Sequence, residues 1–221
     1  MTRAEIIARF RAENPKMTER VVTPTVANNW CYTGDKEVAA FTRCIQGSGS
    51  WTTVEDEQSW LLTEKVPKFF DIDDNPGGGV AYDDKNIKKT TKSALDWEAR
   101  TWRSRTSGIP KKWFRRGNYL WLDRPCSEAV TLDIDVCLVS DDFDDDSKTP
   151  FNGLTYLEPF HQVMVLFLQK KAQMLYGDDG SEGKAEREYL AYVKWMKKEL
   201  SGGKFHNVYL QPKNSLSGYH K

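Results

Sequence analysis

The side chains that most often perform acid–base chemistry near neutral pH are few in this sequence. It contains three histidines, His161, His206 and His220, and two of them lie beyond residue 200. Histidine titrates closest to neutral pH, so it is the usual general acid or base. No GxSxG, HExxH, P-loop or GxGxxG motif is present to place such a group beside a nucleophile, a metal or a phosphate. We interpret His161 as a partly buried surface histidine, and we expect no catalytic residue, no enzymatic activity and no cofactor.

An acidic run at 141–146 has the residue types of a calcium site. Asp142, Asp144 and Asp146 match the first three ligand positions of an EF-hand loop. The position that requires glycine holds serine, however, and the position of the bidentate glutamate holds Gly153. These two departures favour a solvated acidic loop, with an adventitious cation site as the alternative, and no metal-binding residue is assigned.

The four cysteines are too far apart to form a metal-binding or redox motif. None is spaced as CxxC, and Cys31 and Cys137 lie within apolar patterns. We expect buried, reduced thiols, with metal ligation or disulfides as alternatives. The set comprises Cys31, Cys44, Cys126 and Cys137.

The segment 100–124 has the composition of a nucleic-acid interface. It contains eight Lys and Arg residues against Asp123 alone, with Trp113 and Phe114 among them. Cations with interleaved aromatic rings can bind phosphates and stack on bases. Adjacent residues of a strand point to opposite faces, however, so Trp113 and Phe114 cannot both stack outward. The alternative is a hairpin with one core aromatic residue and arginines paired to acidic loops.

Composition excludes several classes of protein. The chain has 221 residues, 39% hydrophobic and 29% charged, with a mean hydropathy of −0.66. These values indicate a folded domain, or one domain with an insertion. Lys plus Arg equals Asp plus Glu at 32 each, so no overall charge draws the chain to nucleic acid or membrane. No apolar run approaches the roughly 20 residues that span a bilayer. We expect no membrane association, and residues 1–15 indicate an amphipathic helix rather than a signal peptide.

The helices and strands that must position these residues fall into successive segments of the chain. In 1–45, Thr2 and Glu5 form a capping-box pattern ahead of a first helix, which ends before Pro15. A second helix is predicted from Pro24 to Cys44, with a possible interruption at Gly34-Asp35.

A strand-rich insertion is predicted over 46–150. Turn signals occur at 47–50 and 75–79. The strand from Thr131 to Val139 alternates, with Leu132, Ile134, Val136 and Leu138 on a buried face. A tight hairpin is predicted at 116–118, and a helix over 93–102 capped by Ser93. The other predicted strands are 60–62, 69–72, 80–82, 113–114 and 119–122.

The segment 151–200 is predicted to form a helix pair, from Pro159 to Tyr176 and from Lys184 to Leu200. The first helix is apolar for six consecutive residues, 163–168, and so must be buried on several sides. We predict that Leu166 and Phe167 divide these sides between the core and a neighbouring subunit. An extended arm at 201–221 follows, whose candidate partner-binding residues are Phe205, Val208, Tyr209 and Leu210.

The predicted fold class is therefore α+β, with a helical core, a strand-rich insertion and an extended C-terminal arm. From Gly108 onward, a Gly-x-Pro, an aromatic strand, a glycine turn, an apolar strand, a proline and an alternating strand follow in order. An acidic linker, the sequence Leu157–His161 and two helices come next. This order resembles the head–tail adaptor (connector) proteins of tailed bacteriophages, well over 90–200 and loosely in the N-terminal helices.

The resemblance implies a virion structural protein whose fold is a helical core with a β-sandwich-like insertion. Such a protein forms a homo-oligomeric ring, typically of twelve copies, between the portal and the phage tail, and it continues the DNA channel. It is made in the host bacterial cytoplasm. The implied partners are the portal protein, tail, nozzle or stopper proteins, and passing genomic DNA without sequence-specific binding. The family has no catalytic residues, so Trp113, Tyr119, Trp121 and Pro125 match it only as scaffold. The alternative function is a nucleic-acid-binding module that uses 100–124.

Overall fold

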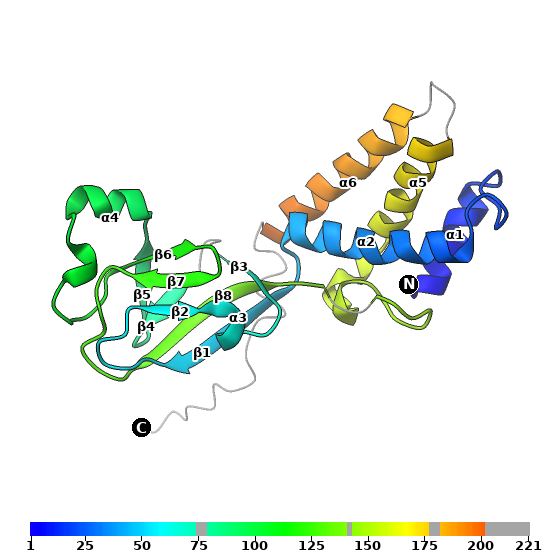
Figure 1. The fold of residues 1–221 in the computed structure, drawn as a ribbon. Helices are drawn as coiled ribbons and strands as arrows, with labels where there is room; N and C mark the ends of the chain where they lie inside the picture. The colour runs from blue at the N-terminus through cyan, green and yellow to red at the C-terminus, as the bar shows by residue number, and fades with distance from the viewer. Residues whose placement is uncertain (74–78, 141–142, 177–181, 202–221) are drawn as a thin grey trace, which may run out of the picture. The chain divides into compact units, whose positions relative to one another are not determined.

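A computed structural model describes residues 1–73, 79–140, 143–176 and 182–201, and within these ranges the fold is α+β (Figure 1). The described residues form six α-helices and a curled, mixed sheet of eight strands. The chain divides into two compact units. The helical unit comprises Met1–Cys44 and Ser140–Lys221, and the strand unit comprises Ile45–Val139.

The first helix, α1 (Arg3–Glu13), begins at the predicted capping box. The Thr2 hydroxyl accepts from the Glu5 amide, and the Glu5 carboxylate accepts from the Thr2 amide at 2.8 Å. These bonds satisfy two donors that a helix start leaves unpaired. The helix buries Ile6 and Phe10 and ends at Asn14, which confirms the predicted boundary.

The second helix, α2 (Pro24–Thr42), runs without interruption through Gly34. Packing explains why glycine stands there. A Cβ at this position would lie 2.5 Å from the Cδ1 atom of Phe167, closer than real Cβ contacts allow. The glycine therefore marks a close approach between two helices rather than a break in one.

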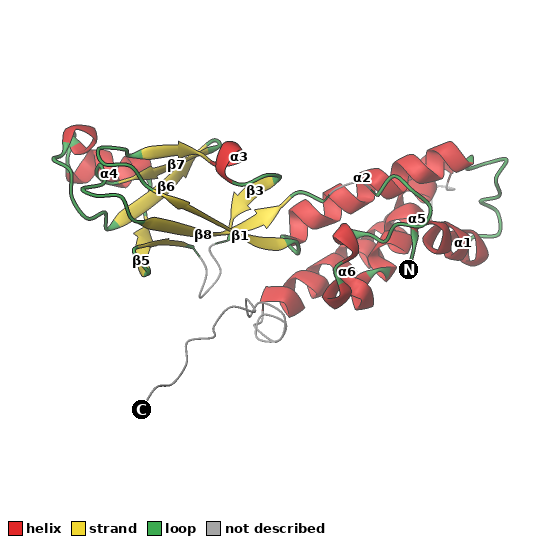
Figure 2. Ribbon diagram, turned by 90° about the horizontal axis from the view of Figure 1, so that it is seen from below, coloured by secondary structure: helices red, strands yellow, loops and turns green. Residues whose placement is uncertain are grey.

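The C-terminal pair consists of α5 (Gln162–Tyr176) and α6 (Glu182–Ser201), which pack on each other and on α2, while α5 also packs on α1 (Figure 2). The predicted start of the first helix at Pro159 differs from the structure. A 3-10 helix, Thr155–Phe160, precedes α5. On α6, Tyr189, Val193, Met196 and Leu200 form the buried stripe that their spacing predicted.

Residues 140–150 group with the helical unit, although the sequence placed them in the insertion 46–150. The Arg3 guanidinium donates to Asp146 Oδ1 at 2.7 and 2.9 Å, and the Arg3 amide donates to the Lys148 carbonyl at 2.8 Å. The Ser140 hydroxyl donates to the Asp35 carboxylate. These contacts join residues distant in sequence, so composition alone did not reveal them.

The strand unit is built around its last strand, β8 (Thr131–Leu138). The sheet order is β1-β8-β4-β5-β6-β7-β2, and β3 also pairs with β8. All pairs are antiparallel except β5 with β6. The other strands are β1 (Gln46–Thr52), β2 (Ser59–Leu61), β3 (Phe69–Ile72), β4 (Val80–Tyr82), β5 (Lys85–Lys89), β6 (Lys112–Arg116) and β7 (Tyr119–Leu122).

Two of these strands were not predicted. The sequence indicated a turn at 47–50, which is wrong, because these residues lie within β1. A Cβ at Gly49 would come within 2.4 Å of the Val66 side chain, so glycine permits a close approach here rather than a turn. β5 is a lysine-rich strand with Ile87 as its single apolar residue, so it lacks a hydrophobic pattern.

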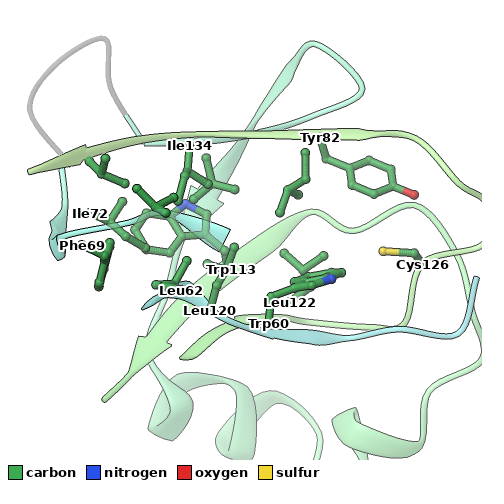
Figure 3. Close-up of a cluster of buried hydrophobic side chains, with 14 residues drawn as sticks. Trp60, Leu62, Phe69, Ile72, Tyr82, Trp113, Leu120, Leu122, Cys126 and Ile134 are labelled. Atoms are coloured by element: carbon green, nitrogen blue, oxygen red, sulfur yellow. The ribbon is translucent and has the colours of Figure 1, made fainter. Parts of the chain in front are cut away.

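The sheet carries apolar side chains on both faces. The larger core includes Trp60, Tyr82, Trp113, Leu120 and Ile134 (Figure 3). A smaller core on α4 (Lys92–Glu98) and β6 joins Leu95, Trp102 and Phe114. The predicted helix over 93–102 is therefore shorter, and its cap is Thr91, whose hydroxyl accepts from the Ala94 amide at 3.1 Å. The short helix α3 (Leu62–Lys65) buries Leu62 beside the larger core.

The alternation of β8 is confirmed except near its end. Leu132, Ile134 and Val136 are buried and Leu138 is half-buried, while Asp135 is exposed as predicted. Cys137, which lies on the opposite face of the alternation, is also fully buried, as expected for a buried thiol.

Candidate functional site

The aromatic residues of the basic segment 100–124 belong to two interior clusters. Trp113 is 2% exposed in the larger core, and Phe114 is 3% exposed in the smaller one. They point to opposite faces of β6, as expected for neighbours in a strand. The prediction of a single core aromatic residue is wrong, because α4 and Trp102 cover the second face. Neither ring is available to stack on a base.

Most cations of this segment already contact a carboxylate. Arg105 donates to the nearly buried Asp123 at 3.3 Å, and Arg124 lies 3.7 Å from the same group. Lys112 pairs with Glu98 and Arg115 with Asp71. Arg103 lies 3.8 Å from Asp96 and stacks over the Trp102 ring. Among the described residues, the exposed cations of this segment that form no ion pair are Arg100, Lys111 and Arg116.

The residues that match the adaptor motif occupy different environments. Trp113 is buried, and Trp121 is half-buried against Trp102 and Phe114. Tyr119 is exposed, and Pro125 is half-buried. The side chains of Trp113 and Trp121 thus pack in the two clusters, whereas the Tyr119 side chain lies on the surface.

The carboxylates of the acidic loop bind neighbouring groups of the protein. Asp146 pairs with Arg3, Asp144 accepts from Lys148 at 2.6 Å, and Asp145 accepts from the Ser147 amide at 2.8 Å. Asp141 and Asp142 lie outside the described residues. Within the described ranges, no three His, Cys, Asp or Glu side chains are placed to hold a metal ion.

His161 is almost fully buried at the start of α5. Its Nδ1 atom lies 2.6 Å from the terminal amine of Met1, and its ring packs near Phe151. Burial lowers the pKa of His161 to about 4, and the positive amine acts in the same direction. The ring is therefore neutral in the fold at physiological pH. It was expected to be only partly buried, and the structure places it deeper.

A second buried titratable group, Asp35, was not recognised in the sequence. Its carboxylate accepts from the Phe151 amide at 2.8 Å and from the Ser140 hydroxyl. Burial raises the pKa of Asp35 to about 6, and these two hydrogen bonds only partly oppose that rise. The signal available in sequence was weak, because an aspartate after a glycine usually indicates a turn. The site fixes Ser140 and Phe151 to α2 within the helical unit.

All four cysteines are buried thiols, in agreement with the sequence interpretation. Burial raises the pKa of Cys31 to about 12, so this thiol is not a thiolate near neutral pH.

The two candidate interface residues of α5 differ in exposure. Phe167 is completely buried and packs edge-on against Tyr189, with ring centroids 5.6 Å apart. Leu166 is half-buried. Of the two, only Leu166 retains surface for a neighbour. The candidate residues of the arm, Phe205, Val208, Tyr209 and Leu210, lie outside the described residues.

The helical unit carries an apolar groove between α2 and α5. Its volume is about 320 Å³, and its lining includes Trp30, Met174 and Leu175. Met174 and Leu175 expose more than half of their surface. Exposed apolar side chains that gather at a groove are typical of contact surfaces between proteins. The strand unit also exposes Trp97 on α4, at 93% of its surface.

No protein-family model matches this chain, and no curated protein is significantly similar to it. None of the described helices is both long and apolar enough to cross a membrane.

Proposed function

We propose that this protein is a virion structural protein, a head–tail adaptor that forms a ring between portal and tail and continues the DNA channel. One observation carries the proposal. Both ends of the described chain build the helical unit, and a strand unit is inserted between them. This is the chain order that the resemblance implies. We further propose that the helical unit is the adaptor core and the strand unit its sandwich-like insertion.

Exposed apolar residues support a binding role for the helical unit. The groove at Trp30, Met174 and Leu175 offers apolar surface that a neighbouring copy would cover. Burying apolar surface stabilises association by about 25 cal/mol per Å² before ordering costs. The proposed partners are other copies of the chain, the portal protein, and tail, nozzle or stopper proteins. The proposed location is the head–tail interface of the virion.

The arm at 201–221 remains a sequence-based part of the proposal. Val208, Tyr209 and Leu210 favour an extended strand that could add to a sheet edge of a partner. Removal of 204–221 should leave the melting temperature of the monomer nearly unchanged and reduce attachment to the portal.

Assembly is the direct test. The full chain, alone and co-expressed with the portal protein of the same genome, would be analysed by native mass spectrometry and negative-stain imaging. The expected result is a closed ring, alone or on the portal. A chain that stays monomeric under both conditions would contradict the proposal.

Two matched variants make the test specific. Leu175→Asp places a charge in the groove at a site 63% exposed, and it should reduce ring formation in a folded protein. Val54→Asp makes the same kind of change in the strand unit at a site 62% exposed. If both variants assemble like the parent, the groove is not a subunit contact.

The alternative, nucleic-acid binding by stacking on 100–124, has less support. Its two aromatic residues are interior, and most of its cations contact carboxylates.

A further inference from the structure

One edge of the sheet in the strand unit has no neighbouring strand. β1 is the first strand in the sheet order, and among the described residues it pairs with β8 alone (Figure 1). At one end of this pairing, the Leu138 amide donates to the Ile45 carbonyl at 2.8 Å. At the other end, the Thr53 amide donates to the Val130 carbonyl at 2.8 Å. The odd-numbered residues of this segment therefore bond to β8.

The even-numbered residues of β1 face away from β8, because the direction of the backbone bonds alternates along an antiparallel strand. The register of β1 against β8 has no shift over the whole strand, so this alternation is uninterrupted. The amides and carbonyls of Ser48, Ser50 and Thr52 thus point to the open edge. None of them bonds to another backbone group within the described ranges, and the three side chains are exposed.

β1 lacks the features by which proteins protect an edge strand. Charged residues, proline, a bulge and a short length each hinder the addition of another strand. β1 is seven residues long, contains no charged residue and no proline, and pairs in a continuous register. The opposite edge strand, β2, has only three residues and follows an acidic stretch at 55–57. β1 is therefore the edge of this sheet that a further strand can extend.

The small residues of β1 leave its backbone accessible. On the inner face, a Cβ at Gly47 would come within 2.9 Å of a β8 side chain, and a Cβ at Gly49 within 2.4 Å of Val66. Packing therefore excludes larger side chains on that face. The outer face carries Ser48 and Ser50, which are small as well. None of these four residues shields the backbone from an approaching strand.

The chain itself carries a segment suited to this edge. The C-terminal arm follows α6, and its residues 202–221 lie outside the described residues. Three consecutive residues of the arm favour an extended strand, Val208, Tyr209 and Leu210. Pro212 would end such a strand, because proline lacks an amide donor. Residues 207–211 would span about 17 Å when extended, the same length as the open backbone of 48–52.

Charge and symmetry favour the arm of a neighbouring copy as the occupant. Residues 202–221 contain three lysines and no acidic residue, β1 has no charge, and β8 places Asp133 opposite Ser50. The arm therefore meets no like charge along β1. A ring requires contacts between different surfaces of successive copies. An arm on the next copy's β1 is a contact of this kind, whereas an arm on its own β1 would join no subunits.

We propose that residues 207–211 of the arm add a strand to the open edge of β1 in a neighbouring copy. The inference rests on the proposed function, because a ring brings the arm of one copy to the strand unit of the next. Main-chain hydrogen bonds provide the affinity in this mode of recognition, so no preformed pocket is needed. In a closed ring each copy donates one arm and accepts one, and the contacts reinforce one another.

Disulfide trapping in the full chain tests this pairing directly. Ser50→Cys protein would be mixed with Val208→Cys or Tyr209→Cys protein and oxidised, and the four native cysteines are buried. Adjacent strand residues face opposite sides, so one of the two arm variants should link to Ser50→Cys much more readily than the other.

Two other products would assign the edge differently. Ser50→Cys protein that links mainly to itself would indicate a contact between the β1 strands of two copies. A double variant that links only within one chain would place the arm on its own β1. Either product would overturn the proposal.

Proline variants test the backbone hydrogen bonds. Ser50→Pro removes an outward amide without removing a bond between β1 and β8, and it should weaken assembly roughly tenfold. Ser59→Pro is the matched control on β2. The Gln58 carbonyl and the Leu62 amide bond to the hairpin of β6 and β7, so the Ser59 amide also points to an open edge. Ser59→Pro should assemble like the parent.

The outcomes separate this inference from the proposed function. Thermal melting shows which variants are folded, and Tyr209→Pro tests the same pairing through the arm if Ser50→Pro is unfolded. Normal rings in Ser50→Pro and Tyr209→Pro without a cross-link, or equal losses in Ser50→Pro and Ser59→Pro, would overturn the inference alone. Cross-linked copies that form no ring, alone or on the portal, would support the pairing and contradict the adaptor function.

Discussion

Asp35 shows how one buried carboxyl group links folding to pH. It lies inside the helical unit, 1% exposed, where burial raises its pKa to about 6 from an ordinary value of 3.8. Between these values the folded chain binds more protons than the unfolded chain. The contribution of this group to the free energy of unfolding is therefore greatest below about pH 4 and is lost as the pH rises through about 6.

Replacement of Asp35 by asparagine should remove this pH dependence. Asparagine keeps an acceptor for the Phe151 amide but does not titrate. From pH 4 to pH 7, Asp35→Asn should gain about 1–3 kcal/mol of unfolding free energy relative to the parent. Urea denaturation at both pH values measures the difference, and Asp84→Asn, an exposed site, serves as the control. Equal changes of unfolding free energy with pH in the parent and Asp35→Asn would contradict the assignment.

His161 acts in the opposite direction over nearly the same range. Its pKa is lowered to about 4 in the fold, from 6.5, so the unfolded chain binds more protons between these values. Stability from this group is present above about pH 6.5 and is lost as the pH falls through about 4.

The non-titrating variant His161→Gln should abolish that loss on acidification. In the parent, the pH-dependent contributions of Asp35 and His161 to stability partly offset each other. The two variants separate these contributions. Asp35→Asn should steepen the loss of stability on acidification, whereas His161→Gln should reduce it. Denaturant melts from pH 4 to pH 7 report both slopes.

Consistent with a structural role, the assembly of a folded His161→Gln protein should match that of the parent. A folded variant without function would indicate a further role for the imidazole ring.

The contact between α2 and α5 depends on the missing side chain of Gly34. Alanine in place of glycine within a helix usually stabilises by about 0.5–1 kcal/mol. Here the new Cβ would meet the Phe167 ring at 2.5 Å, and such overpacking costs about 1–3 kcal/mol. We therefore expect Gly34→Ala to destabilise the protein. Gly183→Ala, on α6 with open space around it, should be neutral or stabilising.

A smaller residue at position 167 should make Gly34→Ala stabilising rather than destabilising. Phe167→Leu by itself removes buried surface, but combined with Gly34→Ala it gives the new methyl group room. The double variant should be more stable than the sum of the two single changes predicts, by about 0.5–3 kcal/mol of coupling. Additive effects in thermal or urea melts would show that the two positions do not touch.

Substitutions on the two sides of α5 are expected to have different effects on folding and assembly. Phe167→Asp would bury a charge with no partner in the helical core and should unfold the subunit. Leu166 is half-buried, so Leu166→Asp should leave a folded protein whose assembly is weakened. Near-UV circular dichroism and native mass spectrometry distinguish these outcomes. Unfolding in both variants would exclude Leu166 as a neighbour-facing residue.

The division into two units predicts that the helical unit folds without the strand unit. Joining residue 44 to residue 140 with a short linker should give a helical species with a cooperative thermal transition. Removing 46–150 instead deletes both Asp146, the partner of Arg3, and Ser140, the partner of Asp35, so this shorter chain should be less stable. Far-UV circular dichroism compares the two chains. A 44–140 fusion that is unfolded would mean that the units depend on each other.

Much of the helical unit follows from sequence because its signals are local. The capping box at Thr2, the proline that begins α2 and the stripe on α6 each involve residues within one or two turns of a helix. The alternation of β8 and the hairpin between β6 and β7 are local in the same way. Contacts between chain neighbours need no knowledge of the remaining fold, so their patterns were sufficient to predict these elements.

Tertiary structure decided the features whose cause lies far along the chain. Gly34 and Gly49 look like breaks in a sequence, but Phe167 and Val66 show that both permit close packing. The boundary at residue 139, rather than 150, depends on Arg3 and Asp35, which lie more than 100 residues away. The parallel pairing of β5 with β6 is likewise encoded by no local pattern. Hydrophobic periodicity records which face of an element is buried, whereas the partner on that face is determined only when distant segments pack together.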